Sequence, residues 1–137
     1  MSVVKELICT ENNGTISFGN YELTKKSKLD DYEFDGDVYK IKTFKEITKL
    51  ERNGLFVYES VPGTAVKRFN VTEEGIDFLV EGSEHAQITL GLEADCVYNV
   101  SLAGESVGEM KTNLGGKLSL SVELPEGVEV SVKVTRQ

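Results

Sequence analysis

The chain has 137 residues, of which 15 are Lys or Arg and 23 are Asp or Glu, giving a formal net charge of −8 at pH 7. A chain of this length suits one domain and buries roughly two thirds of its unfolded surface without needing disulfides. The acidic excess repels a phosphate backbone, so we expect no nucleic-acid partner. No stretch is apolar enough to predict a membrane span, and the N-terminal residues lack a secretory pattern, which favours a cytoplasmic location.

The two cysteines are predicted to be reduced. Cys9 and Cys96 lie far apart in sequence, each beside apolar residues. Partly buried thiols are the favoured interpretation, and a disulfide between them is the alternative, because spacing constrains pairing only weakly.

Short strands are predicted from the start of the chain. Residues 3–9 are mainly apolar, and Ile16 and Phe18 alternate with polar neighbours. The polar residues 24–31 predict a loop. The basic cluster 25–28 in that segment is short and followed at once by acids, which favours a solvated surface over a nucleic-acid site.

A candidate calcium site follows, because carboxylates at alternate positions before and after a glycine resemble the first half of a calcium loop. The twelfth position is Lys42, where a helix-loop-helix site has a bidentate carboxylate, so that kind of site is excluded. A calcium ion in a sandwich loop stays open, against a plain hairpin with an Asp-Gly turn. No other cofactor is predicted. The candidate ligands are Asp31, Glu33, Asp35 and Asp37.

The segment 44–52 is ambiguous between a helix and a strand. Residues 43–46 match a helix capping box, whereas Asn53-Gly54 between apolar alternations is the strongest short-range hairpin signal. We favour the hairpin, because the residues after the turn are rich in β-formers and require a neighbouring strand. A two-residue turn would pair Leu50 with Val57.

Strands recur with short turns through the rest of the chain. Residues 61–64, Val-Pro-Gly-Thr, have the composition of a type II turn, and alternation predicts strands near 65–70, 76–80 and 86–92. We therefore expect an all-β fold, a single antiparallel β-sandwich of jelly-roll type with about ten to twelve short strands and little or no helix.

Residues 1–137 are expected to form one domain. No linker rich in proline, glycine or serine is present, and the best internal boundary is at residues 82–84. This boundary would separate an aromatic-rich part, 1–81, from an aliphatic part, 82–137.

Apolar alternation is clearest between Val97 and Val134, where it predicts a β-meander with one buried face. The residues assigned to that face are Tyr98, Val100, Leu102, Leu118, Leu120, Val122, Leu124, Val128, Val130, Val132 and Val134. The opposite face is rich in Ser, Asn, Lys and Glu and is predicted to be solvated.

Aromatic side chains beside acids are the best candidates for ligand contacts. Tyr32 and Tyr58 have polar neighbours and are expected to be exposed, where they could stack on a sugar ring; Tyr39 and Glu59 complete this candidate site. His85, the only histidine, has no orienting carboxylate and nucleophile in a triad spacing, so we interpret it as a surface loop residue.

A family resemblance is carried by the closing strands. The pattern comprises Tyr98-Asn99-Val100-Ser101-Leu102-Ala103-Gly104, Val107-Gly108, Lys111-Thr112-Asn113, Gly115-Gly116-Lys117-Leu118-Ser119-Leu120 and Val128-Glu129-Val130. It resembles accessory β-sandwich modules found beside bacterial carbohydrate-active enzymes. The resemblance covers about forty residues and implies a similar fold; it implies carbohydrate binding only by analogy.

These observations favour a noncatalytic binding module for a glycan or similar polar ligand. The alternative is a protein-interaction subunit that assembles as a homo-oligomer through a sheet edge or an apolar surface. A small hydrolase that uses a pair of carboxylates ranks below both, because no nucleophile motif accompanies the single histidine.

Overall fold

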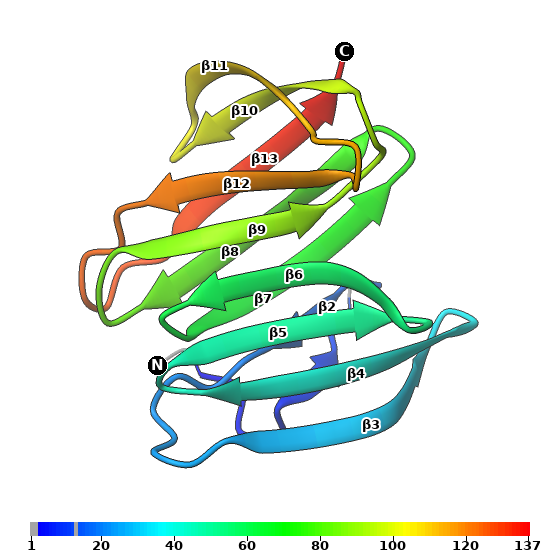
Figure 1. The fold of residues 1–137 in the computed structure, drawn as a ribbon. Helices are drawn as coiled ribbons and strands as arrows, with labels where there is room; N and C mark the ends of the chain where they lie inside the picture. The colour runs from blue at the N-terminus through cyan, green and yellow to red at the C-terminus, as the bar shows by residue number, and fades with distance from the viewer. Residues whose placement is uncertain (1–2, 13) are drawn as a thin grey trace.

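Two antiparallel sheets pack face to face in the computed structural model, which describes residues 3–12 and 14–137 (Figure 1). This confirms the predicted all-β sandwich. The described residues form thirteen strands and no helix. The strands are β1 (Ile8–Thr10), β2 (Ile16–Phe18), β3 (Ser27–Phe34), β4 (Asp37–Phe44), β5 (Ile47–Arg52), β6 (Leu55–Val61), β7 (Thr64–Thr72), β8 (Gly75–Gly82), β9 (Ala86–Gly91), β10 (Val97–Leu102), β11 (Glu105–Lys111), β12 (Lys117–Val122) and β13 (Val130–Arg136).

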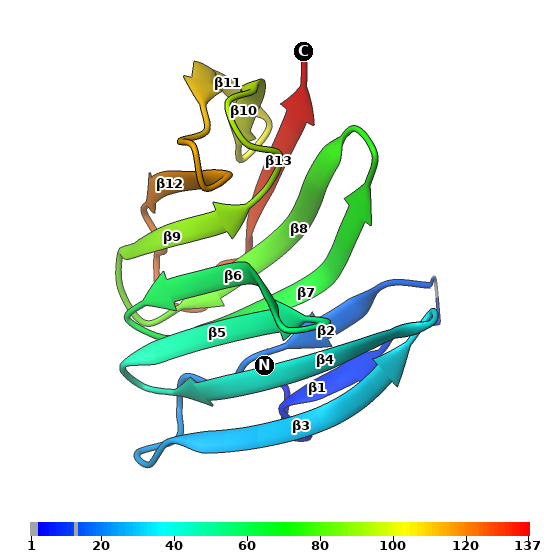
Figure 2. The same ribbon diagram turned by 45° about the vertical axis from the view of Figure 1, so that its right-hand side comes forward.

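The strand order mixes early and late parts of the chain. The seven-stranded sheet has the order β1-β2-β7-β8-β13-β10-β11, and the six-stranded sheet has the order β12-β9-β6-β5-β4-β3. Figure 2 shows the two layers obliquely, with strands of the six-stranded sheet in front of β7 and β8 of the other sheet. Strands from both sides of residue 82 pair within each sheet, so the boundary drawn from composition does not separate the sheets.

The predicted meander is wrong in its connectivity, although most of its buried face is correct. β10, β11 and β13 belong to the seven-stranded sheet, whereas β12 pairs with β9 in the other sheet. Alternation shows that one face of a strand is buried, and it does not show which strand lies beside it. Val128, predicted to be buried, is 48% exposed because it precedes β13 in a loop.

Two hairpins have the turn type that their Asn-Gly and Asp-Gly sequences favour. Asn53-Gly54 has φ of 53° and 80°, and Asp35-Gly36 has φ of 52° and 82°. Positive φ at both central residues is the type I′ geometry that matches strand twist. The structure therefore confirms the hairpin at 53–54, and the helix alternative for 44–52 is wrong.

Two local predictions are corrected. The predicted loop 24–31 is wrong from Ser27 onward, because the polar residues of β3 pair with β4 at the edge of the sheet. The type II turn at 61–64 is also wrong, since the Val61-Pro62 bond is cis and Gly63 does not have a positive φ. Glycine is needed there for close approach, because a Cβ on Gly63 would lie 2.0 Å from the carbonyl oxygen of Phe44.

An aromatic cluster fills the space between the sheets. The ring of Tyr58 packs edge-on against Phe18 and Phe78, with centroids 5.2 Å and 5.6 Å away. Phe18 also packs edge-on against Phe69 at 5.3 Å. Together with the edge-on contact of Tyr58 with Phe69 at 6.2 Å, these contacts join β6 of one sheet to β2, β7 and β8 of the other. Edge-to-face pairs add to the energy of apolar burial.

A network of buried hydroxyl groups joins the two sheets where β6 crosses into β7. The Thr48 hydroxyl donates to the carbonyl of Thr64 at 2.8 Å and accepts from the Thr64 N–H at 3.1 Å. Since Thr48 has one proton, the hydroxyl of Thr43, 2.8 Å away, donates to it. Tyr58 and Ser60 bond to the Thr64 hydroxyl at 2.7 Å and 2.8 Å. Every member is therefore satisfied.

We expect Thr48→Val to lower the free energy of unfolding by at least about 2 kcal/mol, because the Thr64 backbone and the Thr43 hydroxyl lose their buried partner. Urea denaturation measures the change. Thr89→Val, on the outer face of β9, is the matched control and should change stability by no more than about 0.5 kcal/mol. Equal effects of the two substitutions would contradict the structural role of the network.

Candidate functional site

The aromatic residues proposed from sequence do not form an exposed site. Tyr58 is fully buried, so its expected exposure is wrong, and Tyr39 is only 5% exposed, so neither ring is open to a ligand on the surface. The cause for Tyr58 is a β-bulge between β5 and β6, which pairs Leu50 with Tyr58 instead of Val57. The extra residue turns both Val57 and Tyr58 toward the core.

Tyr32 and Glu59 lie in different places. The Tyr32 hydroxyl hydrogen-bonds the Thr10 hydroxyl at 2.7 Å and so bridges edge strands of the two sheets. Glu59 lies on the outer face of β6, opposite Lys49 and Thr89. Tyr32 lies directly opposite Tyr39 in the β3–β4 pairing, whereas Tyr58 and Glu59 lie on β6 and point to opposite sides of the sheet. The four predicted residues therefore do not form one ligand site.

Burial predicts how the two core tyrosines titrate. Desolvation raises the pKa of both Tyr39 and Tyr58, most strongly for Tyr58. Unfolding frees the phenols to ionise near pH 10, so the stability that they contribute is complete below pH 10 and is lost as pH rises above it. We expect ultraviolet titration to show fewer than five phenolates just above pH 10 in the folded chain, with the rest appearing on unfolding. Five ionisations of ordinary pKa would contradict the burial.

The four candidate calcium ligands are spread along the β3–β4 hairpin. Asp35 is in its turn, while Asp37 accepts a hydrogen bond from the Asn53 amide at 2.9 Å. Within residues 3–12 and 14–137, no three His, Cys, Asp or Glu side chains are grouped as a metal site. Calcium binding by these residues remains a prediction.

A calcium titration followed by thermal melting tests it. If the hairpin carboxylates bind the ion, the melting midpoint rises at millimolar calcium, because a ligand that binds only the folded state stabilises it. An Asp35→Asn variant should then lose the shift. An unchanged midpoint for the unsubstituted chain would remove the metal prediction.

The remaining reactive side chains show no catalytic arrangement. His85 is largely exposed, with Nε2 3.8 Å from the Glu123 carboxylate. Cys9 and Cys96 are free and partly buried, as predicted. Burial, with the Glu11 and Glu6 carboxylates, raises the pKa of the Cys9 thiol and makes it less reactive. In the part of the chain that the structure describes, no helix could cross a membrane.

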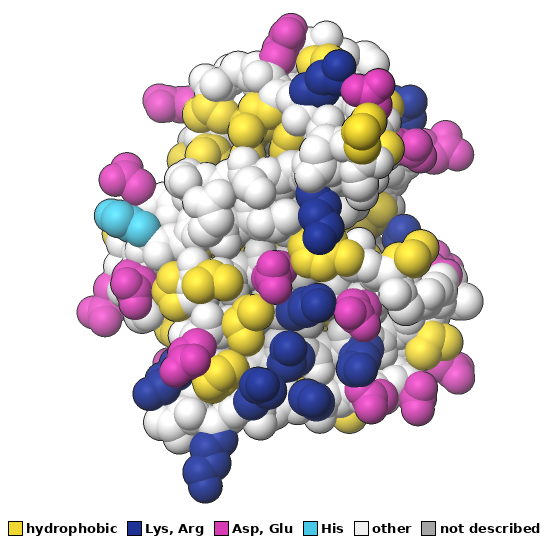
Figure 3. Space-filling model, viewed as in Figure 1, with side chains coloured by type: hydrophobic (Ala, Val, Ile, Leu, Met, Phe, Trp, Pro, Cys, Tyr) yellow, Lys and Arg dark blue, Asp and Glu magenta, His cyan; other side chains and the backbone are white. Residues whose placement is uncertain are grey.

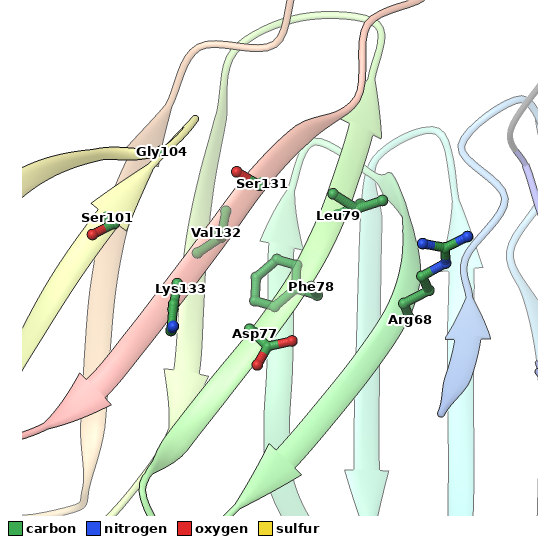
Figure 4. Close-up of a pocket in the computed structure, with 9 residues that line it drawn as sticks. All are labelled: Arg68, Asp77, Phe78, Leu79, Ser101, Gly104, Ser131, Val132 and Lys133. Carbon is green, nitrogen blue, oxygen red and sulfur yellow. The ribbon is translucent and has the colours of Figure 1, made fainter. Parts of the chain in front are cut away.

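A hollow of about 550 Å³ lies on the outer face of the seven-stranded sheet. Phe78 and Val132 point into the core, so their neighbours Asp77, Leu79 and Ser131 point outward. Figure 4 shows these side chains with others from neighbouring strands. The outward-facing residues around the hollow are Arg68 of β7, Asp77 and Leu79 of β8, Ser101 of β10 and Ser131 and Lys133 of β13.

Arg68 reaches this face because of a β-bulge in β7. The register with β8 shifts between Lys67 and Asn70, and Arg68 adopts the left-handed conformation with φ of 55°. Its N–H donates to the Ser17 hydroxyl at 3.1 Å, which fixes the bulge. Bulges of this kind redirect a side chain, and here the bulge leaves Arg68 exposed on the outer face.

The charged groups around the hollow alternate in sign. Asp77 lies directly opposite Lys133 in the sheet, and Lys133 lies opposite Ser101. The side chains of Arg68, Asp77, Ser131 and Lys133 make no hydrogen bond or ion pair with any other residue that the structure describes. Donors and acceptors on this face are therefore available to a ligand.

A second hollow, of about 560 Å³, opens at one end of the sandwich, but several of its polar groups are already engaged. The Lys117 ammonium lies 4.8 Å from the centre of the Phe56 ring, and the Tyr98 hydroxyl accepts the Glu93 N–H at 3.2 Å. The hollow on the outer face of the seven-stranded sheet is therefore the better candidate site.

Sequence reasoning missed this site although it identified part of it as solvated. Ser101, Ser131 and Lys133 lie on the predicted wet face. The pairing of β13 with both β8 and β10 brings them beside Asp77, and it connects Lys133 with residues 56 and 32 positions earlier in the chain, Asp77 and Ser101. A local sequence pattern does not indicate which distant strands pair. The site could therefore be predicted only together with the strand order of the sheet.

Comparisons of the chain with protein-family models, curated proteins and solved structures find no match. The fold and the candidate site together describe an antiparallel β-sandwich with a polar hollow on one outer face.

Proposed function

We propose that the chain is a noncatalytic binding module that holds a glycan or similar polar ligand on the outer face of its seven-stranded sheet. One observation carries this proposal: four polar side chains without partners among the described residues meet at a hollow of about 550 Å³. Ligand sites commonly have volumes of about 300–1,000 Å³ and a few convergent polar groups.

The chemistry of the hollow suits a polyhydroxylated ligand. A sugar hydroxyl both donates and accepts, and the hollow offers donors on Arg68 and Lys133, acceptors on Asp77, and hydroxyls that do both on Ser101 and Ser131. Leu79 adds an apolar surface that can pack against the C–H groups of a sugar ring. Hydrogen bonding, and not stacking on an aromatic ring, would dominate, because the Phe78 ring faces the core.

The composition of the hollow favours binding over hydrolysis. A carboxylate-based glycosidase has two acidic groups about 5–9.5 Å apart across the scissile bond. Asp77 is the only carboxylate among the described residues that line the hollow. The same face therefore supports recognition and offers no partner acid for catalysis.

The family resemblance supports the same class of ligand. The segment that resembles accessory modules of carbohydrate-active enzymes includes Ser101 and Gly104, and both line the hollow. This support is an analogy of fold, and the hollow itself remains the physical argument.

A glycan array followed by calorimetry on the full chain tests the proposal. We expect at least one neutral or acidic oligosaccharide to bind and Asp77→Asn to weaken binding roughly tenfold or more, because a charge-assisted hydrogen bond is lost. Glu105→Gln, an equal change of charge on the exposed strand β11, is the control and should bind normally. The absence of any hit, or equal affinities of the two variants, would contradict the proposal.

A further inference from the structure

Four lysines gather on the other outer face of the sandwich, although the chain is acidic overall. Figure 3 shows basic side chains grouped over β3, β4 and β5 of the six-stranded sheet. They line a hollow of about 210 Å³, and among the described residues Glu51 is the only other one that lines it. We name this group the lysine block: Lys28, Lys40, Lys42 and Lys49.

The sheet register places three of these charges in one row. Lys42 lies directly opposite Lys28 on one side and opposite Lys49 on the other. Neighbouring strands are about 4.8 Å apart, so the row spans about 10 Å. Like charges directly opposite each other destabilise a sheet, so the row is unfavourable in the absence of a ligand.

Acidic side chains compensate the lysine block only in part. Lys49 pairs with Glu51 at 3.6 Å, and the other three lysines make no ion pair with any described residue. Desolvation lowers the pKa of Lys42, and the neighbouring charges of Lys26, Lys49 and Lys28 lower it further. The row of lysines and the single ion pair together indicate that this surface carries unneutralised positive charge.

We propose that the lysine block binds a compact ligand with two or more phosphate or sulfate groups. Adjacent ammonium groups in the row can each donate to a separate oxyanion, and the ligand removes the repulsion between them. This inference does not depend on the glycan proposal, because the two sites lie on opposite outer faces of the sandwich.

The surroundings of the lysine block favour a small ligand over a long polymer or a membrane. On β6, Glu59 lies directly opposite Lys49 and ends the row of lysines. On β5, Glu51 lies directly opposite Lys40. The exposed acids Asp30 and Asp31 lie farther along β3. Duplex DNA carries one charge per about 1.7 Å of its axis, so it would extend beyond the lysines onto these acids.

Binding of inorganic tripolyphosphate, followed by thermal melting and calorimetry at low salt, tests the inference. We expect tripolyphosphate to raise the melting midpoint of the full chain. Lys42→Gln should raise the midpoint without ligand, because it removes repulsion, and should weaken tripolyphosphate binding about three- to tenfold. Lys28→Gln, on the edge strand, gives a second variant with the same expected direction.

Lys117→Gln is the control, because it makes the same change of charge on the same outer face but on β12, at the far edge of the sheet. It should leave tripolyphosphate affinity unchanged, as should Asp77→Asn, which affects only the proposed glycan site. A sulfated disaccharide measured in parallel distinguishes sulfate from phosphate as the preferred group.

Three results would overturn the inference. The first is no shift of the midpoint with either anion, and the second is an equal loss of affinity in Lys117→Gln and Lys42→Gln. The third is tighter binding of duplex DNA or of anionic lipid vesicles than of both compact anions, which would assign the lysine block to a macromolecular surface instead.

Discussion

The hydroxyl network around Thr48 and Thr64 is the constraint on which the sandwich depends. The chain crosses from the six-stranded sheet to the seven-stranded sheet between β6 and β7, and Thr64, the first residue of β7, is fully buried. A buried N–H or C=O without a partner costs about 1–3 kcal/mol, so the crossing requires side-chain partners. Thr48 provides them from β5 and thereby fixes how the two sheets meet. Both outer faces, and hence both proposed sites, are positioned by this contact.

Two β-bulges then decide which side chains reach those faces. The bulge beside Leu50 turns Tyr58 inward, where it contacts Phe18 and the hydroxyl network. The bulge at Arg68 has the opposite result, since it places a guanidinium on the outer face. One inserted residue changes the side of the sheet on which its neighbours lie, and such insertions leave little trace in the apolar pattern.

This explains how much could be predicted from the sequence. Alternation and turn chemistry predicted the fold class, the hairpin at Asn53-Gly54 and nearly all of the buried face after Val97, because each depends on local geometry. The pairing of β12 and the burial of Tyr58 depend on strand neighbours and a bulge, which local patterns do not encode. The lysine block could have been found in part, since two-residue hairpin turns place Lys42 opposite Lys49 by counting.

The contrast between the outer faces argues that the lysine block is more than a solvated surface. On the seven-stranded sheet Asp77 faces Lys133, the alternation of sign that stabilises an exposed sheet. On the six-stranded sheet three lysines face one another, against that rule. Solubility does not require them, because a net charge of −8 already provides it, and these lysines reduce that charge. A row that costs stability and adds nothing to solubility is most simply explained by an anion that binds across it.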